Sequence, residues 1–412
     1  MTAHKNTTCR YCQSDRLFKF LSLGDQPPSN SFLPAAKIAE EEKFPLDVYL
    51  CENCFLVQLL DVVSAEKIFH EYVYLASSSK ALKNHYAQLA TQITERFELK
   101  KGDVVVDIGC NDGILLSGYS SSELVKVGVE PSKVADIAAK AGFRVFKGFF
   151  SPEIAKSIVR DCGKVKIATA TNVFPHVDNI SRFTDGIAPL LSDDGVFIIE
   201  ASYLIDVIDQ TLFDTIYHEH LCYLSLTPVV RFLASHGLEV FDVVRVPFGA
   251  SGPALRVFAQ KIKGPRAVLS SVREMLEMEA KWGVGNVERY TGYADQVNKI
   301  KSEVLKLMRE LQETGSRIGG YGAPAKGNTL LNYFNIKPDL VNKIAETNEL
   351  KQGLLTPGSH IPIVSEERFL EEMPEYALLL TWNYLEFFLK NSEYIRRGGK
   401  FIVPIPFPRI VP

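Results

Sequence analysis

Two histidines flank a glutamate in the stretch TIYHEHLCYLSL (residues 215–226), at His218, Glu219 and His220. Histidine titrates near neutral pH and serves both as a metal ligand and as a general base, and a neighbouring carboxylate can assist either role. Three interpretations follow: a metal site, a proton-transfer site or an exposed turn. In a strand the two histidines would point to opposite faces, which disfavours a shared ion. Proton transfer is therefore favoured, and the turn is the main alternative.

Four cysteines near the N-terminus form two C-x2-C pairs, Cys9 with Cys12 and Cys51 with Cys54. Two such pairs supply the four thiolates of a closed tetrahedral zinc site. The 38 residues between the pairs (13–50) exceed the usual spacing of a short finger, so this insert must fold back. A closed site has no open coordination position. We therefore expect Zn²⁺ to be structural and to stabilise a module too small for its own core.

A turn containing glycines ends the apolar stretch VVVDIGCNDG (104–113) and leads into a predicted helix. It resembles the D/E-x-G-x-G-x-G loop of class I S-adenosylmethionine (SAM) methyltransferases, with Asn111 in place of the middle glycine. Asparagine tolerates the left-handed backbone that such a turn needs. Glu130 ends the next strand, where an acid can accept both hydroxyls of an adenosine ribose. An ordinary turn is the alternative. The predicted SAM-binding residues are Asp107, Gly109, Asn111, Asp112, Gly113, Glu130 and Asn172.

Residues 322–329 (GAPAKGNT) have the spacing of a P-loop, G-x4-G-K-[ST], but Asn328 stands where the lysine should be. Nucleotide hydrolysis needs that lysine, so we reject this activity. Backbone N–H groups at the start of the following helix still suit a pyrophosphate, as in a sugar nucleotide, and a structural turn is the alternative. The predicted substrate-binding residues are Lys326, Gly327, Asn328 and Thr329, with Glu346 and Asn348 at the end of the next strand.

Strands and helices alternate around these motifs. Their order predicts an α/β fold with a doubly wound parallel sheet, whose ligand lies at the carboxyl ends of the strands. Charged amphipathic helices at 270–282 and 294–315 carry the chain to a second region of the same kind. The predicted strands of the middle region lie at 104–113, 125–131, 165–174, 195–202, 238–246 and 254–262. The predicted domains are 1–75, 76–265 and 266–412.

The overall composition narrows the classes of partner. The formal charge of the 412 residues is −3, which argues against a broad nucleic-acid-binding surface. No apolar run approaches the ~20 residues that span a bilayer, and the N-terminal stretch lacks an apolar signal core. Seven cysteines without a secretion signal argue against a disulfide framework. We expect a soluble, cytoplasmic protein that binds neither nucleic acid nor membrane. The oligomeric state stays open, and a monomer is compatible with the sequence.

In this order, the three parts resemble the zinc-containing, SAM-dependent C-methyltransferases of deoxysugar pathways, the tetronitrose C-methyltransferase-like family. The likeness covers nearly the whole chain. It implies an N-terminal zinc module, a central class I SAM methyltransferase domain with a Rossmann-like fold, and a C-terminal Rossmann-like domain that helps to hold a nucleotide-diphosphate keto-deoxysugar. The motifs that carry it are the C-x2-C pairs, SNSF (29–32), DIGCNDG (107–113), NVFPHV (172–177), YHEHLCYLS (217–225), GAPAKGNTLLNYF (322–334), KQGLLTPGSHIPI (351–363) and TWNY (381–384).

The resemblance also implies roles for individual side chains. A carbon beside a ketone becomes nucleophilic only after it loses a proton. We expect His220 to be the base, with Glu219 as its orienter or an alternate base. Tyr217 or His176 then donates to the enolate oxygen, and the carbanion attacks the methyl group of SAM. The family's ligand-contacting positions also include Tyr72 and Tyr74, for which hinge packing is an equal alternative.

Two departures from the family pattern bear on the substrate. The chain has Ser251-Gly252-Pro253-Ala254 where His-Gly-Gly-Ser is expected, which leaves the sugar and even the reaction open. Glu346 replaces an expected aspartate, so a guanosine or uridine diphosphate, with a ribose 2′-hydroxyl, competes with thymidine diphosphate. The alternative functions are a sugar-nucleotide epimerase or non-methylating binder that retains SAM, and a zinc-knuckle RNA methyltransferase.

Overall fold

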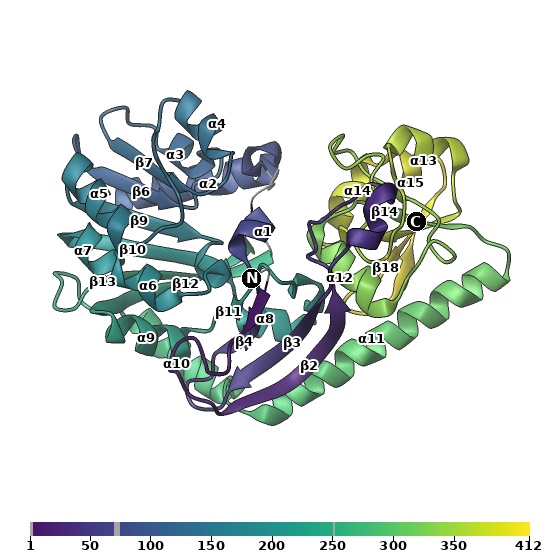
Figure 1. The fold of residues 1–412 in the computed structure, drawn as a ribbon, viewed down its shortest axis with the longest axis horizontal. Coiled ribbons are helices and arrows are strands. Elements are labelled where there is room, and N and C mark those ends of the chain that lie inside the picture. Colours follow the sequence, from purple (N-terminus) through teal and green to yellow (C-terminus); the bar gives the residue numbers. More distant parts are fainter. Residues whose placement is uncertain (1–2, 70–74, 250–251) are drawn as a thin grey trace.

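Two α/β domains lie side by side above a curved N-terminal sheet in the computed structural model (Figure 1). The structure describes residues 3–69, 75–249 and 252–412. Tyr72, Tyr74 and Ser251, to which the sequence predictions refer, lie outside these ranges. Among the described residues, no helix combines the length and apolar character that a bilayer crossing requires.

The central domain is built on a seven-stranded sheet. The strand order is β8 (Arg144–Lys147), β7 (Val125–Glu130), β6 (Val104–Ile108), β9 (Val165–Thr171), β10 (Leu191–Ser202), β13 (Gly252–Lys261) and β12 (Leu238–Gly249). The first five strands are parallel, and β13 is antiparallel to both of its neighbours. Numbered along the domain, this order is 3-2-1-4-5-7-6. It confirms the predicted Rossmann-like class I fold, and its switch point between β6 and β9 is where such sheets bind ligands.

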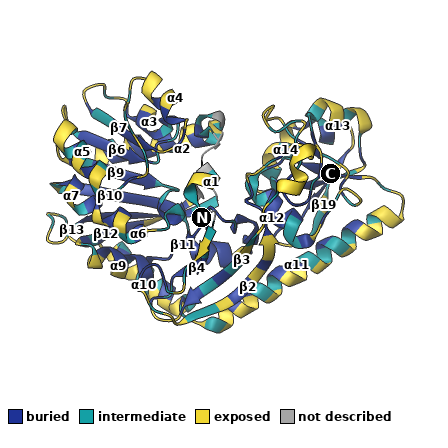
Figure 2. Ribbon diagram, in the orientation of Figure 1, coloured by how far each residue is buried: buried dark blue, intermediate teal, exposed yellow. Residues whose placement is uncertain are grey.

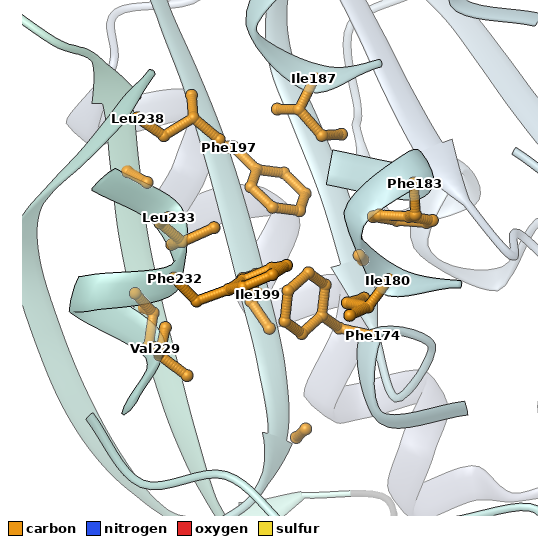
Figure 3. Packing of buried hydrophobic residues seen from close by; sticks show 14 of the residues in the cluster. Phe174, Ile180, Phe183, Ile187, Phe197, Ile199, Val229, Phe232, Leu233 and Leu238 are labelled. Carbon is orange, nitrogen blue, oxygen red and sulfur yellow. The ribbon is translucent and has the colours of Figure 1, made fainter. Parts of the chain in front are cut away.

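Helices cover both faces of this sheet. They are α2 (Lys80–Arg96), α3 (Ile114–Gly118), α4 (Ala135–Lys140), α5 (Pro152–Cys162), α6 (Ile180–Asp185), α7 (Ile187–Leu190), α8 (Leu204–Asp209) and α9 (Leu226–Ser235), with short 3-10 turns η2 (Ala76–Ser78), η3 (Phe174–His176) and η4 (Phe213–Thr215). On one face, Leu82 and Leu89 of α2 pack against the strands. On the other, Phe174, Phe197 and Phe232 interlock between β10 and the helices (Figure 3). This cluster fixes the position of η3.

The N-terminal module contributes an antiparallel sheet of order β11-β4-β3-β2. Its members are β2 (Leu17–Gln26), β3 (Phe44–Cys51), β4 (Val57–Leu59) and β11 (Cys222–Tyr223), beside the pair β1 (Ala3–Lys5) and β5 (Asp61–Val63); η1 (Ala35–Glu40) and α1 (Ala65–Phe69) complete the module. Strand β11 belongs to the segment that follows YHEH, and Cys222 pairs with Gln58 of β4. The N-terminal sheet is therefore completed by the middle of the chain.

The C-terminal domain has a six-stranded sheet that is parallel except for its last strand. The order is β16 (Ile363–Val364), β15 (Ile344–Ala345), β14 (Ile318–Tyr321), β17 (Tyr376–Leu379), β18 (Lys400–Val403) and β19 (Arg409–Val411), with helices α12 (Ala325–Phe334), α13 (Glu366–Glu372), α14 (Leu385–Asn391) and α15 (Glu393–Arg396) and the turn η5 (Trp382–Tyr384). Two connecting helices precede it. Helix α10 (Ser270–Trp282) packs on β12 and α9, and α11 (Val287–Glu313) runs along β2 to the last domain (Figure 1).

One apolar cluster joins the three parts. It contains Leu46 and Val48 of β3, Tyr290 and Val297 of α11, and Leu330 of α12. Buried residues line the strands that face this core, while α11 exposes its outer side (Figure 2). Burying each large apolar side chain contributes about 1.5–3 kcal/mol. The N-terminal sheet therefore packs against both α/β domains and holds them together.

Candidate active site

The three parts of the chain meet around one cavity of about 920 Å³. Its wall takes Asn30 from the N-terminal module, Gly109 and His220 from the central domain, and Lys326 from the C-terminal domain. The cavity reaches the carboxyl ends of β6, β7 and β9, where a doubly wound sheet binds its ligand. Its volume lies at the upper end of the ~300–1,000 Å³ typical of ligand pockets, which suits two ligands side by side.

In the turn after β6, glycines leave the backbone uncovered by side chains. Gly109 and Asn111 have φ of 72° and 50°, so both take the left-handed conformation that glycine and asparagine tolerate best. A Cβ at Gly109 would lie 2.3 Å from Cγ2 of Val173, so no side chain fits there. At Gly113, which precedes α3, a Cβ would lie 2.7 Å from the ring of Phe143. The glycines therefore allow a ligand, and the helix, to approach closely.

Two acids and an amide line the cavity beside this turn. The Glu130 carboxylate accepts from the backbone N–H of Asn111 at 3.0 Å, which holds it at the end of β7. Asp107 accepts from the hydroxyl of Thr169 at 2.7 Å, and burial raises the pKa of Asp107 to about 7. Asn172 directly follows β9 and has a φ of 54°. These three of the seven predicted cofactor residues line the same cavity.

The side chains of Asn111 and Asp112 also form hydrogen bonds to the backbone of a neighbouring segment. Their side-chain oxygens accept from the backbone N–H groups of Ala76 and Ser77, each at 3.0 Å. Asn111 also lines the cavity, whereas Asp112 and Gly113 are not among its lining residues. These bonds tie the segment before α2 to the cofactor turn.

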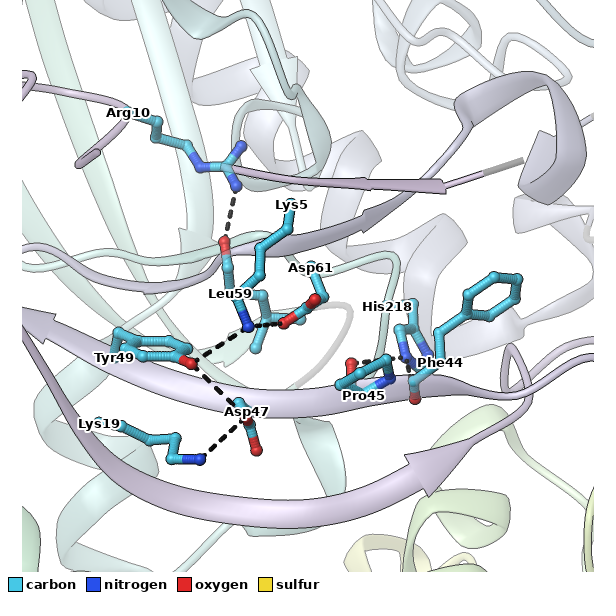
Figure 4. A network of polar contacts seen from close by, with 10 residues as sticks. All are labelled: Lys5, Arg10, Lys19, Phe44, Pro45, Asp47, Tyr49, Leu59, Asp61 and His218. Carbon is cyan, nitrogen blue, oxygen red and sulfur yellow. Dashed lines mark hydrogen bonds and ion pairs between the residues drawn. The ribbon is translucent and has the colours of Figure 1, made fainter. Parts of the chain in front are cut away.

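The YHEH stretch forms a turn between η4 and β11, not a strand. Its two histidines nevertheless face different ways. The Nε2 of His218 lies 3.2 Å and 3.3 Å from the carbonyl oxygens of Phe44 and Pro45 on β3 (Figure 4). A carbonyl only accepts, so Nε2 donates, and burial lowers the pKa of His218. His218 therefore links the YHEH turn to the N-terminal sheet by hydrogen bonds and does not line the cavity.

His220 faces the cavity, and a hydrogen bond determines which of its ring nitrogens carries the proton. Its Nδ1 lies 2.7 Å from the carbonyl oxygen of Thr215, so Nδ1 carries the proton and Nε2 keeps its lone pair. Burial lowers the pKa of His220 to about 4, which keeps the ring neutral at physiological pH. The rings of Tyr217 and His176 lie with their centroids 4.0 Å and 4.9 Å from that of His220. Burial, and then His220, hold the pKa of His176 well below its usual range.

Glu219 has a partner in another module. Its Oε1 accepts from the side-chain amide of Asn30 at 2.7 Å. Burial raises the pKa of Glu219 to about 7, and the bond from Asn30 acts in the opposite direction. The group that orients the His220 ring is thus the Thr215 carbonyl and not the carboxylate of Glu219. Asn30 is not among the predicted site residues, although it belongs to the SNSF motif (29–32) that carries the resemblance.

The C-terminal domain lines the far end of the cavity with cations. Lys326 donates to Asn383 at 2.5 Å, lies 4.2 Å from the Trp382 ring centroid, and is 4.0 Å from a carboxylate oxygen of Asp214. Burial lowers the pKa of Lys326, and Asp214 opposes this effect. Lys351 also lines the cavity, and burial lowers its pKa too. Lys351 is not among the predicted site residues, because the KQGLLTPGSHIPI motif (351–363) that it opens carries the resemblance without assigning a ligand contact to this lysine.

Glu346 and Asn348 are placed differently from each other. Glu346 lines the cavity, and its two carboxylate oxygens accept from the backbone N–H groups of Ala323 and Asn348, each at 2.9 Å. The side chain of Asn348 is exposed and caps the following turn by accepting from the N–H of Leu350 at 3.0 Å. The structure therefore brings Glu346, and not the side chain of Asn348, to the site.

The other three predicted residues of the P-loop-like turn, Gly327, Asn328 and Thr329, do not line the cavity. The amide of Asn328 donates to the Ser29 carbonyl at 2.7 Å, and the Thr329 hydroxyl donates to the Ile216 carbonyl at 3.1 Å. Gly327 packs against Leu380, where a Cβ would approach to 2.9 Å. Of the four predicted residues in this turn, the structure brings Lys326 to the cavity and places the other three in the surrounding packing.

The four N-terminal cysteines form a compact cluster. All their sulfur atoms lie within 4.8 Å of one another, with 3.5 Å between Cys9 and Cys54 and 3.6 Å between Cys12 and Cys51. Tetrahedral zinc with Zn–S bonds of about 2.3 Å places its sulfurs roughly 3.8 Å apart, so the donor set fits this ion. Asn53 donates to the Cys12 sulfur at 3.4 Å, a typical outer hydrogen bond. Among the described residues no other such cluster exists, which disfavours a metal at YHEH.

Comparison with known proteins identifies the chain. Three family models match in succession: "Putative zinc binding domain" over 9–69, "Methyltransferase domain" over 82–243 and "C-methyltransferase C-terminal domain" over 249–406. Over 406 residues the chain is 34% identical to the C-methyltransferase NovU of Streptomyces niveus, spanning 98% of this chain and 96% of that protein. The chain belongs to this C-methyltransferase family.

Other similarities of this C-methyltransferase are more partial. An uncharacterized protein, MJ1252 of Methanocaldococcus jannaschii, is 28% identical over 137 residues, which span 33% of this chain and 52% of that protein. A SAM-dependent methyltransferase from Clostridium acetobutylicum aligns with 43% of this chain and 92% of its own, at 13% identity and a TM-score of 0.35.

The prediction that SAM is the cofactor is confirmed for this C-methyltransferase. The chemistry of the site fits SAM, because the bare backbone at Gly109 admits a ligand while Glu130 offers carboxylate oxygens to a ribose. The matched zinc-binding domain contains the four clustered cysteines, so the predicted structural Zn²⁺ is supported as well.

Proposed function

We propose that this C-methyltransferase methylates the carbon beside the ketone, C-3, of a nucleotide-diphosphate keto-deoxysugar. The observation that carries the proposal is that one cavity is lined by Gly109 of the cofactor turn, by His220 and by Lys326. Each end suits one ligand. The central domain suits SAM, and the C-terminal domain suits a sugar nucleotide.

His220 acts on the sugar. Its Nε2 removes the proton next to the ketone, and the Nδ1–H bond to the Thr215 carbonyl stabilises the imidazolium that results. The Tyr217 hydroxyl or His176 donates to the enolate oxygen as negative charge develops there. SAM, when bound, supplies the electrophilic methyl group that the carbanion attacks. Glu219, with its pKa near neutrality, is the alternate base.

The C-terminal domain holds the nucleotide. Lys326 and Lys351 are two cations in the wall of the cavity, and the pyrophosphate of a sugar nucleotide is a dianion. Glu346 lies near them and accepts nucleoside hydroxyls through its remaining lone pairs. The proposal places the enzyme in the cytoplasm, because a reducing compartment keeps the zinc-binding thiols available.

The direct test is methyl transfer to a panel of 4-keto-6-deoxy sugars linked to thymidine, uridine and guanosine diphosphate. With labelled SAM, we expect label in one sugar product, and NMR of that product locates the new carbon. No label in any of the sugars contradicts the proposal. Proton exchange without methyl transfer favours an epimerase, and transfer to RNA favours the RNA-methyltransferase alternative.

The role of His220 is tested by exchange of the sugar α-proton in deuterated water without SAM. His220→Asn should slow exchange by about 10²–10⁴-fold, as loss of a general base does. The matched control is His236→Asn, since His236 lies at the end of α9, outside the cavity, and bonds the Phe232 carbonyl at 2.9 Å. Unchanged exchange in the His220 variant removes this residue from its role.

A further inference from the structure

The first turn of α12 faces two ways. Lys326 lies in the wall of the cavity, whereas Asn328 and Thr329 are 1% and 0% exposed and contact segments of the two other modules. These contacts run to Ser29, in the SNSF loop, and to Ile216, just before YHEH. A single helical turn therefore joins the nucleotide end of the cavity to both walls of the proton-transfer cluster.

The hydrogen-bond directions around Thr329 are determined. Its one hydroxyl proton goes to the Ile216 carbonyl at 3.1 Å, since a carbonyl only accepts. The hydroxyl of Ser29, 3.2 Å away, must then donate to the Thr329 oxygen. Ser29 is held a second time, because its carbonyl accepts from the Asn328 amide at 2.7 Å. The Thr329 hydroxyl thus bridges two segments that are far apart in sequence.

Both segments lead directly to the cluster. Ser29 precedes Asn30, whose amide holds Glu219 at 2.7 Å. Ile216 follows Thr215, whose carbonyl holds the His220 ring at 2.7 Å. Shifting either segment would therefore move one of the two candidate bases. Neither Asn328 nor Thr329 lines the cavity, so any effect of theirs on the sugar acts through these neighbours.

We propose that Thr329 and Asn328 are positioning residues for proton abstraction, which hold the Ser29 and Ile216 segments so that Glu219 and His220 face the sugar carbon. The inference rests on the proposed function of Glu219 and His220. Because Thr329 is fully buried, a lost hydroxyl bond is not replaced by solvent, and the Ile216 carbonyl must move to find another donor. Misplacement of a reacting group by about 1 Å costs up to ~100-fold in rate.

The experiment compares four variants of the full chain. Thr329→Val removes the hydroxyl at nearly constant volume, and Thr329→Ser restores it. Ser29→Ala cuts only the bond to Ser29 and provides a milder variant where Thr329→Val fails to fold. Thr184→Val is the matched control, because Thr184 is also fully buried with one hydroxyl bond, to the Ile180 carbonyl at 2.8 Å in α6.

Steady-state methyl transfer and α-proton exchange separate positioning from binding. Thr329→Val should lower kcat and the exchange rate by about tenfold or more, with KM for the sugar nucleotide within about twofold of wild type. Thr329→Ser should recover the rate, and Thr184→Val should leave it unchanged. A raised KM with unchanged kcat assigns Thr329 to substrate binding and overturns the proposal, as does a wild-type rate in Thr329→Val.

Amide hydrogen exchange of the ligand-free protein gives a readout that needs no substrate. Thr329→Val should speed exchange in peptides covering 28–33 and 213–221, while Thr329→Ser and Thr184→Val should not. Unchanged protection in Thr329→Val overturns the proposal. If the wild-type enzyme methylates no sugar but protection is lost as expected, the proposed function fails and the structural link stands, so the two failures are distinguishable.

Discussion

The side-chain amide of Asn30 donates to the carboxylate of Glu219 across 2.7 Å, although 189 positions separate the two residues. The N-terminal module therefore contributes directly to the candidate active site. Burial raises the pKa of Glu219 to about 7, and the Asn30 bond only partly offsets this effect. A carboxyl whose pKa is higher in the folded than in the unfolded chain destabilises the fold when it ionises.

This relationship predicts that Glu219→Gln raises the free energy of unfolding at high pH but hardly at low pH. The stability linked to protonated Glu219 is fully present below pH 4.5 and is lost as the pH rises through about 7. An uncharged glutamine avoids this loss, so unfolding at pH 8.5 should cost up to about 3 kcal/mol more than in wild type. At pH 5 the difference should fall below about 1 kcal/mol. Urea unfolding at both pH values measures it, with the exposed Glu313→Gln as control. An equal effect at both pH values contradicts the assignment.

Two glycines with left-handed backbone provide a matched test of the cofactor turn. Gly109 and Gly142 have φ of 72° and 94°, but only at Gly109 does a Cβ collide, 2.3 Å from Val173; at Gly142 nothing lies within 4 Å. Each alanine variant pays about 1–2 kcal/mol of backbone strain. Gly109→Ala should in addition weaken SAM binding by about tenfold or more, equivalent to about 1.4 kcal/mol, because Val173 adjoins Asn172. Calorimetric titration with SAM tests this. Equal affinities in the two variants would remove Gly109 from the site.

The sequence predicted the parts of this site that depend on local pattern. Strands β6, β7, β9 and β10 are apolar runs, and glycines and asparagine mark the turn after β6, so the sheet and the SAM turn follow from hydrophobicity and backbone conformation. Strand β8 was not predicted, because RVFK (144–147) is short and partly exposed. Strand β11 has only two residues and exists through pairing with β4.

Long-range partners were beyond sequence reasoning. Nothing near Asn30 or Glu219 indicates that they meet, and a side chain on α12 can face the cavity or the SNSF loop with the same local pattern. Lys326 and Thr329 are three positions apart, yet the structure places one at the cavity and the other in the packing behind it. Which face of the turn meets the ligand is decided by the other two modules.

Asp214 should control the charge of Lys326. Asp214 is fully buried, accepts from the Trp382 indole at 2.6 Å and lies 4.0 Å from the ammonium of Lys326. Burial already lowers the pKa of Lys326, and Asp214 is the group that counteracts it. In Asp214→Asn the lysine should lose its proton at lower pH. We therefore expect KM for the sugar nucleotide to rise about tenfold at pH 9, the equivalent of one hydrogen bond to a charged group, and much less at pH 6.5.

The control for this prediction is Asp209→Asn. Asp209 accepts from the indole of Trp282 at 3.0 Å in the same way, but it is exposed and does not contact Lys326. Steady-state kinetics at both pH values compares the two variants. A KM that rises equally at pH 6.5 and 9 would show that Asp214 acts on packing and not on the lysine charge.

Loss of the zinc ion should loosen the YHEH turn and leave the turn after β6 unchanged. Cys54 stands just before β4, β4 pairs with β11, and β11 continues from His220 through Leu221, whose carbonyl accepts from Leu59 at 3.0 Å. Cys54→Ser should therefore lose the ion, lower Tm by about 5 °C or more and speed amide exchange in β4 and β11. SAM affinity should stay within about threefold, because none of the four clustered cysteines lines the cavity. Cys162→Ser, at the end of α5, is the matched control and should retain one zinc per chain by elemental analysis. A Cys54 variant that keeps its zinc, or that loses SAM affinity together with stability, would contradict this separation of the two sites.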